Sequence, residues 1–205
     1  MIYIPNHSAP IVSIYFIFRR SRFALPHCKT AVMELALRQF TQETQRKSRH
    51  QFLDRLEYLG SELKPVYMHE ALGIKGTMLT EHRQEILELW QEAIQLPLLS
   101  ADHFADTQRI YSHELQNRYE EDEYLSYIWL LRLLYRTHPL WPSVSLSPKA
   151  IEDVTIDEVK DLWPSLFSQD TFVPCFSGDL SLTQAQQSAL TFAQNLPHTA
   201  HPLAP

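Results

Sequence analysis

Cysteine and glycine are scarce in this sequence, and each scarcity excludes a kind of functional site. The 205 residues include two cysteines, Cys28 and Cys175, which lie far apart with no Cys-x-x-Cys spacing. This excludes a disulfide framework and a zinc site built from cysteines, so we interpret both residues as buried free thiols. The four glycines form no glycine-rich phosphate loop and no Gly-x-Ser-x-Gly turn, and we therefore expect no cofactor.

Long hydrophobic runs and dense positive charge are also missing. No apolar run approaches the roughly 20 residues that cross a bilayer, and the run Ile11–Phe18 has no basic region before it. The net charge is −6, and the densest basic cluster is Arg19, Arg20 and Arg22, whereas nucleic-acid binding needs many clustered cations. We expect a cytoplasmic or otherwise soluble protein without a signal peptide, a membrane partner or a nucleic-acid partner.

The composition that is present is typical of a globular protein. Hydrophobic residues make up 44% of the chain and charged residues 20%, and the length suits one domain with a substantial core. We assign residues 1–196 to a single domain and the proline-containing residues 197–205 to a loose tail.

The spacing of apolar residues predicts a mixture of strands and helices. Strands are expected at residues 1–6 and 10–20, joined by a turn, at 62–79 as strand, turn and strand, and at 170–180. Helices are expected at residues 26–40, 48–58, 80–94, 102–124, 124–135, 155–167 and 181–195. Expected helix ends are Ser48, Thr80, either Ser100 or Asp102, and Thr155 with Glu158 as N-terminal caps, and Gly60 as a C-terminal stop.

The segment 124–135 is apolar on most sides, which is typical of a buried helix. Two interpretations of this run are open, a core helix and the wall of a ligand pocket, and the composition favours the core helix. Its large side chains are Tyr124, Tyr127, Ile128, Trp129, Leu131, Leu133, Leu134 and Tyr135.

Four phrases, taken in order, resemble one domain of the insulinase-like (inverzincin) metallopeptidases. They are RKSRHQFLDRLEYLGSEL at 46–63, TEHRQEILELWQEAIQLPLLSADHF at 80–104, TQRIYSHELQNRYEEDEYLSYIWLLRLLYRTHPLW at 107–141, and the segment from SPKAIEDV to SGDLSL at 147–182. The resemblance covers nearly the whole chain, from about residue 4 to residue 196. It implies an α+β domain with an antiparallel or mixed sheet covered by helices.

Active domains of that family carry His-x-x-Glu-His on their first helix, where two histidines bind zinc and the glutamate activates a metal-bound water. With residues 46–60 as the anchor, the motif positions fall on Glu34, Leu37 and Arg38. Leu37 cannot accept a proton, and Arg38 places a permanent cation where an imidazole lone pair should face the metal. No change of register restores the motif, because no histidine occurs between His27 and His50.

The resemblance also implies a third zinc ligand, a glutamate on a later helix. The matching residue is Glu114, and the accessory acidic position two turns earlier is Thr107. Since the other two ligands are replaced, we interpret Glu114 as a solvated or ion-paired residue and expect no metal site.

Other histidines match zinc motifs only in part. His69 and His113 begin like His-Glu-x-x-His, but Gly73 and Asn117 occupy the last position, and the inverted match that begins at His82 lacks its final histidine. We interpret all three as chance matches.

The sequence thus predicts a catalytically inactive peptidase homologue that acts as a binding or scaffold subunit. Family peptidases are built from several such domains facing each other, so the expected partner is another insulinase-like domain, as a homodimer or heterodimer, with a peptide as a further candidate. The alternative is a zinc metallopeptidase whose site is completed by another chain. The family's substrate-gripping phrase of the type LREKRGLAY has no equivalent here.

Four tryptophans in separate segments support an interface, because one core of this size seldom buries them all. They are Trp90, Trp129, Trp141 and Trp163. We predict a total buried area on the order of 1,200–2,000 Å².

Overall fold

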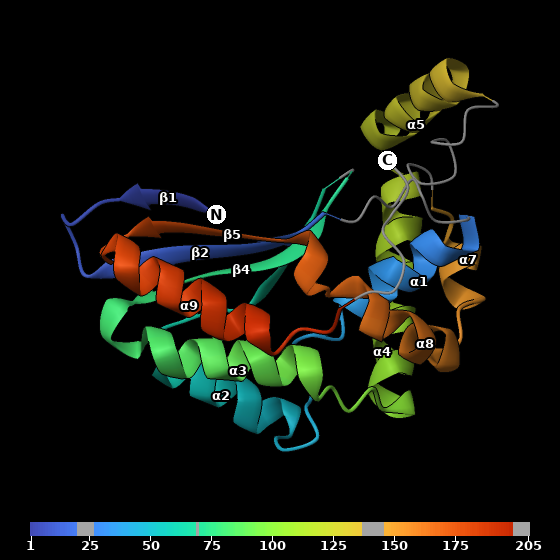
Figure 1. Cartoon of the computed structure of the whole chain (residues 1–205). Coiled ribbons are helices and arrows are strands. Elements are labelled where there is room, and N and C mark those ends of the chain that lie inside the picture. The colour runs from blue at the N-terminus through green and yellow to red at the C-terminus, as the bar shows by residue number, and fades with distance from the viewer. Residues whose placement is uncertain (20–26, 69, 137–145, 199–205) are drawn as a thin grey trace.

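The computed structural model describes residues 1–19, 27–68, 70–136 and 146–198, without the side chains of residues 27–29 (Figure 1). The described residues form one five-stranded sheet in the order β1-β5-β2-β4-β3. The strands are β1 (Ile2–Pro5), β2 (Ile11–Phe18), β3 (Lys64–Tyr67), β4 (Leu72–Leu79) and β5 (Phe172–Gly178). Because β1 runs parallel to β5 and the other pairs are antiparallel, the sheet is mixed, as predicted.

The first two strands form where the sequence predicts them, but they do not pair with each other. β5 lies between them, with Ile2 opposite Cys175 and Ile14 opposite Phe176. The hydroxyl of Tyr3 donates to the carbonyl of Leu180 at 2.6 Å and fastens β1 to the end of β5. A local residue pattern locates strands, but it does not reveal a partner strand that lies far along the chain.

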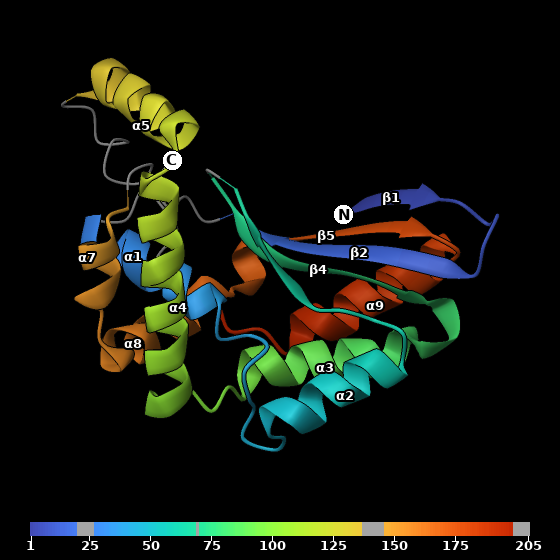
Figure 2. The same cartoon turned by 180° about the vertical axis from the view of Figure 1, so that it is seen from behind.

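One face of the sheet carries the core. Along β2 every second residue is buried, as expected for a strand with one packed face. Three helices cover this face in both views, α2 (Arg49–Tyr58), α3 (Arg83–Gln95) and α9 (Leu182–Gln194) (Figures 1 and 2). Phe16 lies at the centre, with its ring centroid 5.9 Å from that of Trp90 and 4.2 Å from that of Phe192.

No described helix covers the opposite face of the sheet, which we call the open sheet face (Figures 1 and 2). Cross-strand contacts order its side chains. Lys75 lies over the ring of Tyr15, and the hydroxyls of Ser13 and Thr77 are 3.0 Å apart. The open sheet face comprises Ile11, Ser13, Tyr15, Lys75, Thr77, Cys175 and Ser177.

A second group of helices packs at one end of the sheet (Figure 2). It consists of α1 (His27–Leu37), α4 (Ala101–Tyr119), α7 (Pro148–Glu152) and α8 (Ile156–Leu166), with contacts between α1 and each of the other three. The indole nitrogen of Trp163 donates to the carbonyl of Ile94 at 2.8 Å and ties α8 to the end of α3. This group places α1 against α4.

Several predicted helix ends are confirmed, and one is wrong. Ser48 and Thr155 each complete a capping box, and Gly60 follows α2 with a left-handed φ of 64°. Thr80 does not cap α3, because residues 80–82 form a short 3₁₀ helix. The Thr80 hydroxyl donates instead to the carbonyl of Asp179 at 2.9 Å. The partner of this hydroxyl is therefore a carbonyl far along the chain and not a backbone N–H of α3.

The helix α5 (Asp122–Tyr135) is not the buried core helix that its composition predicts. Ile128 and Leu131 are buried, and α4 is its main neighbour. α5 extends away from the sheet and the other helices (Figures 1 and 2), so one stripe is covered and the other sides face solvent. Its side chains exposed by 52% to 68% are Tyr127, Trp129, Leu130, Leu133 and Leu134.

Some sequence predictions lie outside the described residues. These are Arg20, Arg22, His69, Trp141, the side chain of Cys28 and residues 199–205. Cys175 is a free thiol as predicted, but it is partly rather than fully buried. Before the undescribed end, His198 contacts Asp170 at 3.2 Å. Within the described ranges, no helix combines the length and hydrophobicity needed to span a membrane.

Candidate functional site

The first helix brings two of the three motif positions onto one face. Glu34 lies in the last turns of α1, and Arg38 follows just after its end, so the two side chains are one turn apart and form an ion pair at 3.0 Å. Leu37 is fully buried in the hydrophobic core. The residue that the sequence aligns with the general-base position is therefore a packing residue.

The guanidinium of Arg38 is held by several acceptors. Its Nη1 donates to the carboxylate oxygen Oε2 of Glu34 at 3.0 Å, to the backbone carbonyl of Glu34 at 3.1 Å and to the hydroxyl of Tyr67 at 3.0 Å. The Tyr67 hydroxyl donates in turn to the Glu34 carbonyl at 3.1 Å. A side chain from β3 thereby donates a hydrogen bond to a backbone carbonyl near the C-terminal end of α1.

An aromatic ring from α4 covers the same guanidinium. The guanidinium carbon of Arg38 lies 3.5 Å from the ring centroid of Tyr111, a cation–π contact. The Tyr111 hydroxyl lies 3.5 Å from Oε2 of Glu34. Glu34, Arg38, Tyr67 and Tyr111 thus form one cluster, which we call the Arg38 cluster, with residues from α1, β3 and α4.

Burial and the neighbouring charges together set the pKa values of the Arg38 cluster. Burial alone would lower the pKa of Arg38, but Tyr67, Tyr111 and Glu34 outweigh it and raise that pKa. Burial, followed by the negative charge of Glu34, raises the pKa of both Tyr67 and Tyr111 above the usual value. At neutral pH both phenols therefore keep their protons, and Arg38 keeps its charge.

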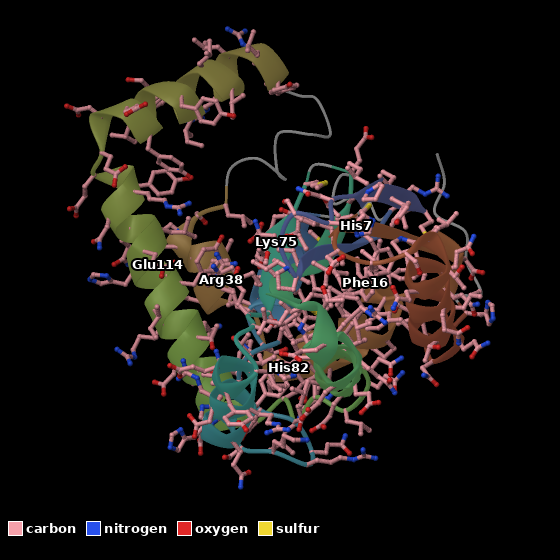
Figure 3. All side chains as sticks on the ribbon, turned by 90° about the vertical axis from the view of Figure 1, so that its left-hand side faces the viewer. His7, Phe16, Arg38, Lys75, His82 and Glu114 are labelled. Atoms are coloured by element: carbon pink, nitrogen blue, oxygen red, sulfur yellow. The ribbon has the colours of Figure 1, made fainter. Side chains whose placement is uncertain are left out.

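Glu114 is not part of this cluster. It lies exposed on α4 (Figure 3), and its side chain makes no hydrogen bond or ion pair with another described residue. The α4 residue that contacts the motif positions is Tyr111, about one turn earlier. Thr107, the accessory position, is buried, and its hydroxyl donates to the carbonyl of His103 at 2.8 Å.

The residues of the Arg38 cluster do not fit a zinc ion. Zinc binds through lone pairs of imidazole, thiolate or carboxylate, whereas the guanidinium of Arg38 offers only N–H donors. Among the residues that the structure describes, no three histidine, cysteine, aspartate or glutamate side chains are grouped to hold a metal. The partial motifs do not alter this. His113 lies beside Asn117 at 3.2 Å, and His82 is 3.8 Å from Glu81.

Sequence reasoning missed both tyrosines of the Arg38 cluster. Tyr67 lies 33 positions from Glu34 and Tyr111 lies 77 positions from it, and neither belongs to a motif. The sequence feature that could have identified Tyr111 lies within α4 itself. Helical spacing puts Tyr111 and Leu115 on one face, and that buried face, rather than the exposed one with Glu114, had to meet α1.

Solved structures reveal which fold this is. No family model matches the sequence, and no curated protein matches it significantly. A peptidase M16 inactive domain from Pseudomonas fluorescens superimposes with a TM-score of 0.85 at 19% identity, over 98% of this chain and 50% of that one. A protease from Helicobacter pylori gives a TM-score of 0.85 at 12% identity, over 99% of this chain and 49% of that one. For the periplasmic protease PqqL from Escherichia coli the TM-score is 0.80 at 10% identity, over 98% of this chain and 24% of that one.

The likeness confirms the predicted fold class. The chain has the α+β fold of M16, or insulinase-like, peptidase domains, with a mixed sheet and helices packed on one face and at one end. It spans about half the length of the structures from Pseudomonas and Helicobacter.

Proposed function

We propose that this chain is a non-catalytic insulinase-like domain that acts as a binding or scaffold subunit. The observation that carries the proposal is the Arg38 cluster. A guanidinium held by Glu34, Tyr67 and Tyr111 lies at the end of α1, to which the resemblance assigns the family's zinc motif. A permanent cation there would repel Zn²⁺, and Leu37 cannot activate a water molecule.

We propose further that the domain pairs with itself or with a catalytic domain of the same family. Two features support this. The chain corresponds to about half of the structures that share its fold. It also leaves the open sheet face and most of α5 exposed, and the extent of apolar exposure on α5 is typical of an interaction surface. A peptide is a further candidate ligand of the open sheet face.

The alternative function, a zinc peptidase completed by another chain, depends on Glu114. Its exposure on α4 would allow a ligand from a second chain to approach it. The Arg38 guanidinium disfavours this function, because a completed site would contain its charge close to the metal.

Light scattering and co-purification test the pairing. At micromolar concentration the purified chain should scatter as a dimer, or it should retain another insulinase-like domain when purified from its native source. A monomer that retains no such domain in either experiment would contradict the proposed pairing.

A further inference from the structure

The exposed apolar surface of α5 is the feature of this molecule that its own fold explains least. Five large apolar side chains on this helix are between 52% and 68% exposed. A helix that is apolar on most sides is normally covered on most sides. Here the main covering element is α4, on the stripe that contains Ile128 and Leu131.

The outward residues follow helical spacing and have the composition of a binding surface. Trp129 and Leu133 are four residues apart and Leu130 is three residues before Leu133, which places these three exposed side chains on one side of α5, opposite the buried stripe. The guanidinium of Arg132 lies 5.0 Å from the ring of Trp129. Tyrosine, tryptophan and arginine are the residues most enriched at the energetic centres of interfaces.

Charge is distributed unevenly along α5. The start of the helix is acidic, with Glu120, Glu121, Asp122 and Glu123 in succession. The end is basic, with Arg132 and Arg136. Asp122 is the first residue of α5 and Arg136 follows its last residue, so these two charges lie at opposite ends of the helix, about four turns or ~21 Å apart.

The charge pattern of α5 is complementary to that of a second α5 that runs in the opposite direction. We infer that α5 docks against α5 of a second copy of this chain, antiparallel, about a two-fold axis at the level of Trp129. A two-fold interface brings residue i against residue j and residue j against residue i. Asp122 of each copy then faces Arg136 of the other copy, and the two Trp129 side chains meet near the axis.

The inference rests on the proposed scaffold function, because it assigns the pairing which that function requires to one helix and one partner. A second copy supplies both charges and both apolar stripes from the same sequence. A helix pair ~21 Å long should bury less than the roughly 1,200 Å² of a standard interface, which is below the area predicted from the sequence. We therefore expect a dissociation constant in the micromolar range.

Sedimentation velocity over a range of micromolar concentrations measures this dimer. Leu130→Glu and Leu133→Glu each place a carboxylate in the apolar contact and should weaken the dimer more than about thirty-fold. The matched control is Leu190→Glu on α9, which also replaces an exposed leucine and should leave the dissociation constant unchanged. Circular dichroism checks that each variant keeps its helices.

A charge exchange tests the antiparallel register. Asp122→Arg alone and Arg136→Asp alone should each weaken the dimer about three- to thirty-fold, since both create like charges across the two-fold. An equimolar mixture of the two variants should regain wild-type affinity as a heterodimer, because every cross-copy pair is then opposite in sign. Each substitution also changes the interaction between a charge and the dipole of its own helix. Mixing the two variants would not reverse that change.

The outcomes separate this inference from the proposed function. A dimer that none of the α5 variants weakens would overturn the α5 contact and leave the proposed pairing standing. A monomeric chain that co-purifies with another insulinase-like domain would overturn the second copy as partner and support the heterodimer. A monomer with no partner would overturn both.

Discussion

At the scale of single residues, the guanidinium of Arg38 compensates a carboxylate that the fold has taken out of water. The side chain of Glu34 is only 9% exposed, and a buried carboxylate needs a cation or several donors to remain in place. Arg38 supplies the cation, and the Tyr111 ring packs on the guanidinium. The residue that the sequence aligns with a metal-ligand position therefore also stabilises the end of α1.

Replacing this arginine should measure that stabilisation. Arg38→Met removes the cation and its ion pair with Glu34, so the free energy of unfolding should fall by about 2–3 kcal/mol. The control is Arg109→Met, which breaks an exposed ion pair with Asp106 and should cost less than about 1 kcal/mol. Urea titrations of both variants compare them, and equal losses would show that the Arg38 cluster has no special role.

The phenols of the Arg38 cluster predict a loss of stability at high pH. Burial raises the pKa of Tyr67 and Tyr111 above the ordinary value of 10.0. The unfolded chain then releases protons at a lower pH than the folded one. Their contribution is complete below about pH 10 and is lost as the pH rises further, by up to about 1.4 kcal/mol per pH unit for each phenol.

Spectrophotometric titration of tyrosine provides the test. Tyr111→Phe should remove one late-titrating phenol and flatten the decline of unfolding free energy above pH 10. Tyr58→Phe, at an exposed tyrosine, should leave that decline unchanged. A Tyr111 phenol that ionises together with the exposed ones would contradict the buried geometry.

At the scale of elements, the structure depends on close approach between β4 and α3. Gly76 lies beneath the fully buried Trp90, and a Cβ at this glycine would lie 2.5 Å from the indole ring and 2.1 Å from the carbonyl oxygen of Glu62. Neither neighbour can move freely, because one is core and the other is backbone. The glycine is therefore required for helix–sheet packing.

Gly76→Ala should consequently destabilise the domain by about 2–4 kcal/mol, as overpacking of a filled core does. Thermal unfolding followed by tryptophan fluorescence measures the loss and reports on Trp90 itself. Ser177→Ala, on the exposed side of β5, is the matched control and should change stability by less than about 0.5 kcal/mol. A tolerated Gly76→Ala would show that α3 is packed more loosely than described.

Some features of the helices and strands were predictable from the sequence, and others were not. Helix starts such as Ser48 and Thr155 were predictable because the capping partner lies three residues away. The pairing of β1 with β5 was not, since its partner is more than 160 residues distant. The burial of α5 was predicted wrongly, because hydrophobicity indicates that a surface will be covered without indicating by which chain.

The candidate site follows the same division. Helical spacing was enough to put Glu34 and Arg38 side by side on α1. It could not supply Tyr67 and Tyr111, which reach the guanidinium from β3 and α4 through tertiary packing. The loss of the motif is a prediction from the sequence, and the structure shows which side chains surround Glu34 and Arg38.

At the scale of the whole molecule, the domain has one packed face and one open face. Helices α2, α3 and α9 cover the core side of the sheet, and α5 extends beyond the body of the domain (Figures 1 and 2). The chain also spans about half of two structures with the same fold. This arrangement suits a subunit whose role is to present surfaces to a partner.

Metal analysis is the direct test of the prediction that the domain binds no catalytic zinc. The protein is purified in the presence of zinc, dialysed, and measured by inductively coupled plasma mass spectrometry alongside a peptidase assay with and without chelator. We predict far less than one zinc per chain and no chelator-sensitive activity, because Arg38 and Leu37 occupy motif positions. One zinc per chain that is lost in Glu114→Ala would contradict the account.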